Sequence, residues 1–75
     1  MTNTRLLKAK IVESGKTYRE IAHELGISET SLRNKVNNRV PFKVREIAIL
    51  VQILHITSKD EYFFALDVEK FEQNT

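Results

Sequence analysis

Residues 17–37, which read TYREIAHELGISETSLRNKVN, decide the fold that this chain can adopt. Thr17 and Glu20 have the spacing of a capping box, in which each side chain bonds the other residue's backbone N–H. Gly26 stands where a sharp turn needs a left-handed residue, and Ser28 follows as a second helix cap. The stretch therefore predicts two short helices, one stopping at Gly26 and one starting after Ser28.

The apolar positions in this stretch predict how the two helices pack. Ala22 is small where the helices would cross closely, while Leu25, Ile27 and Leu32 would hold them at a steep angle. Leu32 and Val36 lie one turn apart on the inner face of the second helix. These features favour a helix-turn-helix; the alternative is a plain helical hairpin inside a small bundle.

The remaining segments predict helices as well. One runs from about Asn3 to Ser14 and stops at Gly15, with an apolar stripe of Leu6, Leu7, Ile11 and Val12. Another covers about Val44–Leu54, and its expected core stripe is Val44, Ile47, Ala48, Val51 and Leu54, extended by Ile49, Leu50 and Ile53. A short last helix starts at a second capping box, Ser58–Glu61, and its aromatic residues are expected to plug the core: Tyr62, Phe63 and Phe64. The expected fold is all-α, with five helices.

Length and charge limit the architecture and the partners. The 75 residues make one small domain, which we place at residues 1–66, followed by an acidic tail at residues 67–75. Residues 1–46 hold ten Lys and Arg against five Asp and Glu, whereas residues 47–75 hold two against five. The basic half is suited to a polyanion such as nucleic acid; the alternative is ordinary charge scatter on a surface.

Other classes of protein find little support. The chain has no cysteine, no signal-peptide core and no apolar run near the roughly 20 residues that span a membrane, so a cytoplasmic protein without membrane contact is expected. His23 and His55 belong to no metal-ligand spacing, so neither a metal nor a cofactor is expected. An enzyme is not expected either, because a catalytic pocket is hard to build in so short a chain.

The outward face of the second short helix carries side chains that can read bases. Asn34 can form paired hydrogen bonds with adenine, Arg33 can do so with guanine, and the Thr30 methyl can pack on a thymine methyl. Glu29 can accept from cytosine N4 or simply stabilise the helix N-terminus. Cations that would neutralise phosphates follow this helix: Arg39, Lys43 and Arg45.

The segment TYREIAHELGISETSLRNKVNNRVPF resembles the lambda-repressor-like, or XRE/Cro-type, helix-turn-helix family, and VREIAILVQILHI is similar to that family's fourth helix. The resemblance covers roughly residues 4–64. The combination of SLRNKVNNRVPF, EI and EYFF is closer still to short regulators of temperate phages of Gram-positive bacteria. The resemblance implies a five-helix domain, a role on operator DNA and no cofactor.

The resemblance also implies roles for single residues. Tyr18 stands where the family often has a phosphate-contacting Gln, and Asn37 matches an Asn that often binds phosphate. Lys35 departs from the family, which often keeps an aliphatic there; Val36 is expected to take the burial instead. The complete DNA-binding set is Tyr18, Arg19, Ser28, Glu29, Thr30, Ser31, Arg33, Asn34, Asn37, Asn38, Arg39 and Lys43.

A protein partner is the main alternative to direct DNA binding. In this interpretation the chain is an antirepressor or modulator whose SETSLRNKVNNR segment, residues 28–39, binds the basic reading helix of a phage repressor. Glu29 would then pair with a cation of the partner. The strongly apolar segment 44–54 also leaves room for a homodimer, because a helix that is apolar on most sides must be covered.

Overall fold

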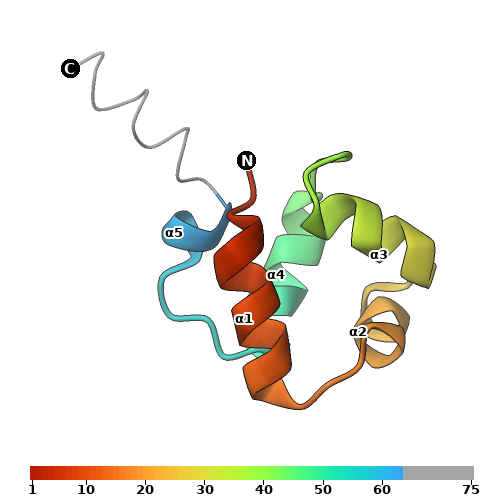
Figure 1. The fold of residues 1–75 in the computed structure, drawn as a ribbon, viewed down its shortest axis with the longest axis horizontal. Helices are drawn as coiled ribbons and strands as arrows, with labels where there is room; N and C mark the ends of the chain where they lie inside the picture. The colour runs from red at the N-terminus through yellow and green to blue at the C-terminus, as the bar shows by residue number, and fades with distance from the viewer. Residues whose placement is uncertain (64–75) are drawn as a thin grey trace.

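The computed structural model describes residues 1–63, and every regular element within them is a helix. The bounds are α1 Thr4–Ser14, α2 Tyr18–Leu25, α3 Glu29–Val36, α4 Val44–Ile53 and α5 Lys59–Phe63. α2 contacts both α3 and α4, while α1 contacts α3 and α5. Figure 1 shows α1 between α5 on one side and the α2–α3 pair on the other. The described chain is therefore all-helical, as the sequence predicts.

Local capping interactions begin and end these helices. The Asn3 side chain accepts from the Leu6 N–H at the start of α1, and Gly15 ends that helix with a φ of 75°. At α2, the Thr17 hydroxyl accepts from the Glu20 N–H at 3.1 Å, and the Glu20 carboxylate accepts from the Thr17 N–H at 2.8 Å. The predicted capping box at Thr17–Glu20 is confirmed.

One apolar core joins the helices. Its members are Leu7, Ile11, Ile21, Ala22, Leu25, Leu32, Val36, Ile47, Leu50, Leu54, Ile56 and Phe63. Phe63 packs edge-to-face against Phe42, with ring centroids 5.7 Å apart, so its predicted role as a plug is confirmed. The same prediction for Phe64, and the boundary between residues 66 and 67, lie outside the described residues.

The predicted inner face of α4 is partly wrong. Val44 is 81% exposed and Ala48 is also exposed, whereas Leu50 is fully buried and Glu46 is buried with it. Glu46 can be buried because the Lys35 side chain on α3 pairs with it. The buried face of α4 therefore consists of Glu46, Ile47, Leu50 and Leu54. Val12 is likewise exposed, so the apolar stripe of α1 is narrower than predicted.

The N-terminal segment holds α1 against the end of α3. The Thr2 N–H donates to Asn38 Oδ1 at 2.9 Å, and Asn38 Nδ2 donates back to the Thr2 carbonyl at 2.6 Å. The Thr4 hydroxyl donates to the Val36 carbonyl, also at 2.6 Å. These bonds link residues more than 30 positions apart, so they fix where α3 lies in the molecule. No helix within residues 1–63 is both long and apolar enough to cross a membrane.

Candidate nucleic-acid interface

A tight link of three residues, 26–28, joins α2 to α3. Gly26 has a φ of 72°, and the Ile27 N–H donates to the Ala22 carbonyl at 3.0 Å. The Ser28 hydroxyl then accepts from the Ser31 N–H at 3.0 Å and caps α3. Because the link is short and bonded at both ends, it determines which face of α3 turns outward.

The inner face of α3 is fully buried. Leu32 and Val36 have no exposed surface, as predicted, and Lys35 is only 8% exposed. Lys35 Nζ donates to both carboxylate oxygens of Glu46 on α4, at 2.6 and 2.8 Å. Val36 is buried as expected, but the expectation that it replaces Lys35 in the core is wrong, since Lys35 is buried as well. A lysine can stand at an aliphatic position here because an acid faces it.

The Glu46 carboxylate is held in its charged form. Burial raises its pKa, but the hydrogen bonds from Lys35 Nζ and from the Lys43 N–H at 2.9 Å outweigh burial and leave the pKa below its ordinary value of 4.5. The same carboxylate therefore ties α3 to α4 and holds the first turn of α4. This buried ion pair, together with the buried Leu32 and Val36, holds the inner face of α3 against the rest of the protein.

The outer face of α3 is polar. Glu29, Thr30 and Arg33 are exposed, and Ser31 and Asn34 are partly exposed. The Asn37 side chain is also exposed, and its Nδ2 donates to the Arg33 carbonyl at the end of the helix. The structure thus brings the predicted base-reading residues onto one surface.

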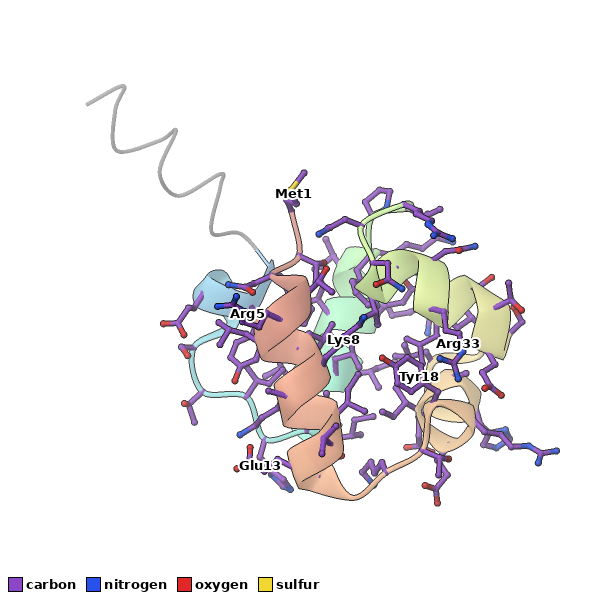
Figure 2. The ribbon with its side chains drawn as sticks, in the orientation of Figure 1. Met1, Arg5, Lys8, Glu13, Tyr18 and Arg33 are labelled. Atoms are coloured by element: carbon purple, nitrogen blue, oxygen red, sulfur yellow. The ribbon has the colours of Figure 1, made fainter. Side chains whose placement is uncertain are left out.

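Three side chains on this surface, one from α2 and two from α3, contact one another. The guanidinium of Arg33 lies 4.4 Å from the centroid of the Tyr18 ring, and its Nη2 donates to Glu29 Oε2 at 3.0 Å. Figure 2 shows Tyr18 and Arg33 side by side where α2 meets α3. We call Tyr18, Glu29 and Arg33 the Arg33 cluster. Sequence reasoning treated these three residues separately. The i,i+4 spacing of Glu29 and Arg33 could have revealed their pairing, whereas the contact of Arg33 with Tyr18 joins two helices and no spacing within one helix reveals it.

Of the remaining predicted residues, three have exposed side chains and one, Asn38, has a side chain that is bonded within the protein. Arg39 and Lys43 are exposed, and so is Arg19 on α2. Asn38, a predicted DNA-binding residue, adopts a left-handed conformation with a φ of 65°, and its amide is bonded to Thr2 and to the Thr4 hydroxyl. The Asn38 side chain therefore holds the N-terminal segment in place.

Two basic side chains outside the predicted DNA-binding set extend toward α2 and α3. Arg45, expected to neutralise phosphate, also donates from Nη2 to the Leu25 carbonyl at 3.4 Å and so reaches the end of α2. Lys8 was not part of the predicted set, yet in Figure 2 it extends from α1 on the side that faces α3. Only the packing of α1 on α3 places Lys8 there.

Of three comparisons with known proteins, only the one with family models gives a match. No curated protein and no solved structure matches the chain. Within residues 1–63 no three His, Cys, Asp or Glu side chains are grouped as metal ligands would be. A family model described as "Protein of unknown function (DUF739)" matches residues 2–66, which is most of the chain. The chain therefore belongs to the DUF739 family.

Proposed function

We propose that this protein is a sequence-specific DNA-binding transcriptional regulator, a Cro-like protein of a phage genetic switch that acts in the bacterial cytoplasm. In this proposal α2 and α3 form a lambda-repressor-like helix-turn-helix, and α3 enters the major groove of operator DNA. One observation carries the proposal: α3 is buried along Leu32, Lys35 and Val36, while its polar face remains exposed.

The exposed face has the chemistry that the proposal needs. Amide and guanidinium groups that can bond base edges lie on α3 at Asn34 and Arg33. Arg19 on α2 and Arg39 and Lys43 after α3 are exposed cations, and in this proposal they contact phosphates. Base readers flanked by phosphate contacts are the general arrangement of major-groove binding proteins.

The test is binding of purified protein to DNA from its own regulatory region, measured by fluorescence anisotropy at several salt concentrations. Arg39→Ala is expected to weaken binding to all sequences similarly and to lower the slope of log K against log salt by about one. Asn34→Ala is expected to relax sequence preference at one position. Arg5→Ala is the matched control for Arg39→Ala, since Figure 2 places Arg5 on the α5 side of α1. Affinity that does not change with salt contradicts the proposal.

We propose further that two copies bind a pseudo-palindromic site with half-sites about 34 Å apart. The exposed apolar side chain of Val44 at the start of α4, which is 81% exposed, supports self-association through that helix. DNA with one half-site should bind far more weakly than DNA with two, and a change of the spacing by half a helical turn should remove the difference. Equal affinity for all three fragments would rule out the dimer.

A second function is favoured by Glu29, which places an exposed acid among the candidate base readers. DNA phosphates repel an acid, whereas a basic protein surface attracts it. In this alternative the protein is an antirepressor that binds a phage repressor through the outer face of α3. A pull-down with the repressor encoded beside it is the test, and Glu29→Lys should abolish that capture. Capture that survives both Glu29→Lys and Asn34→Ala would exclude this face of α3.

A further inference from the structure

The Arg33 cluster holds the guanidinium of Arg33 at an exposed position on the outer face of α3. Tyr18 comes from the first turn of α2, and Glu29 and Arg33 come from α3. The side chains of Arg33 and Glu29 are 55% and 46% exposed, whereas Tyr18 is half-buried and packs against the core. The Tyr18 ring is thus held by the fold, and the guanidinium that lies on it faces solvent (Figure 2).

Two contacts restrict the guanidinium in different ways. The contact with Tyr18 holds the centre of the guanidinium over the ring, and the bond from Nη2 to Glu29 restricts its rotation. An arginine side chain has five N–H donors in a rigid fork. Among residues 1–63 no side chain or carbonyl accepts from Nη1 or Nε. Nη2 contributes one N–H to the edge that it shares with Nη1 and one to the edge that it shares with Nε, so one of these two edges keeps both of its N–H groups available.

A paired N–H edge of arginine matches the O6 and N7 acceptors of guanine. Because the long side chain is already ordered by its two neighbours, less rotamer freedom is lost when it binds. The two contacts themselves contribute little to stability, since exposed ion pairs and exposed cation–π contacts are weak.

We propose that Arg33 reads a guanine in the operator and that Tyr18 and Glu29 are positioning residues for its guanidinium. The inference rests on the proposed function and deepens it. Tyr18 acts through its ring and not through its hydroxyl, and Glu29 acts through Arg33 and not on a cytosine. These assignments differ from the roles that the sequence alone suggests for both residues.

The experiment selects binding sites from a pool of random DNA duplexes, using the intact chain and a set of variants, and measures base preference at each position. The wild type is expected to prefer guanine at one position by about 10- to 100-fold. Arg33→Ala should abolish that preference alone. Tyr18→Leu and Glu29→Ala should each reduce it several-fold, and Tyr18→Phe should retain it. Tyr18→Leu combined with Arg33→Ala should lose no more at this position than Arg33→Ala.

The outcomes separate this inference from the proposed function. If the wild type selects no sequence, the proposed function fails and the inference falls with it. If the wild type selects a sequence, the inference is overturned when Arg33→Ala keeps the guanine preference or when Glu29→Ala changes a cytosine at another position instead. Should circular dichroism show that Tyr18→Leu is unfolded, Glu29→Ala, at an exposed position, decides the question. Unchanged guanine preference in Glu29→Ala then overturns the positioning role.

Discussion

Helix α3 carries an ion pair on each of its faces, and the two pairs lie in contrasting surroundings. Lys35 and Glu46 are 9% and 1% exposed at their side chains and join α3 to α4. Arg33 and Glu29 are about half exposed and lie on α3 alone. Water screens the exposed pair and lets it exchange partners, whereas the buried pair has no substitute for its partner. The same chemistry therefore fixes the helix on its buried face and leaves the pair on the other face exposed to solvent.

Removal of one member of the buried pair should have the largest effect on stability. Glu46→Ala leaves the Lys35 ammonium without its partner in the core, and we expect a loss of about 3–5 kcal/mol in the free energy of unfolding. Urea denaturation measures it. The control is Lys35→Met combined with Glu46→Met, which removes both charges and should be close to the wild type or more stable. A loss in Glu46→Ala below about 1 kcal/mol would show that the pair is not buried in solution.

The buried pair should also weaken in acid. The pKa of Glu46 in the folded protein lies below 4.5, so its ionised carboxylate stabilises the fold fully above that pH. The contribution is lost as the pH falls through the lower, folded-state value. Unfolding free energies measured from neutral pH downward should therefore fall less steeply in the double Met variant than in the wild type. Identical slopes in the two proteins would contradict the lowered pKa.

Asn37 and Asn38, at the end of α3, differ in a similar way: the Asn38 amide bonds a distant part of the chain, whereas the Asn37 amide bonds its own helix. Asn38→Ala removes the bonds to Thr2 and places alanine at a φ of 65°, so we expect a loss of about 1–3 kcal/mol. Asn38→Gly removes the bonds but tolerates that φ, and should cost less. Asn37→Ala, at an exposed position, should change stability by less than about 0.5 kcal/mol. Thermal unfolding ranks the three variants, and equal values for Asn37→Ala and Asn38→Ala would refute the structural role of Asn38.

Loss of the exposed pair should have the smallest effect. Glu29→Ala and Arg33→Ala, measured singly and together in urea, should give a coupling energy of about 0.2–1 kcal/mol. The weak coupling follows from the exposure of both side chains, which is about half. A coupling above 2 kcal/mol would mean that the pair serves folding, and the contrast between the two faces of α3 would then disappear.

Local features of the fold could be predicted well. The caps at Thr17 and Ser28, the left-handed residue Gly26 and the inward side chains of Leu32 and Val36 are all confirmed. The inner face of α4 could not be predicted, because apolar residues lie on nearly all sides of that helix and several stripes fit equally well. The face that is buried includes Glu46, and a prediction from sequence places a charged residue such as Glu46 on the surface.

The candidate site divides in the same way. The sequence identified which side chains α3 exposes, including Arg33 and Asn34, because the spacing along one helix is enough for that. It did not show that Arg33 lies on Tyr18, or that Asn38 is bonded to Thr2. Each of these contacts joins different elements and depends on how the helices pack.

The sequence by itself thus determined where α2 and α3 begin and where α1 and α2 end, because capping bonds and left-handed dihedral angles involve only a few neighbouring residues. Only the tertiary structure decided the partner of Lys35, the buried face of α4 and the setting of Arg33. The physical reason is distance along the chain: Lys35 and Glu46 are 11 residues apart, and their attraction acts only after packing has brought α3 and α4 together.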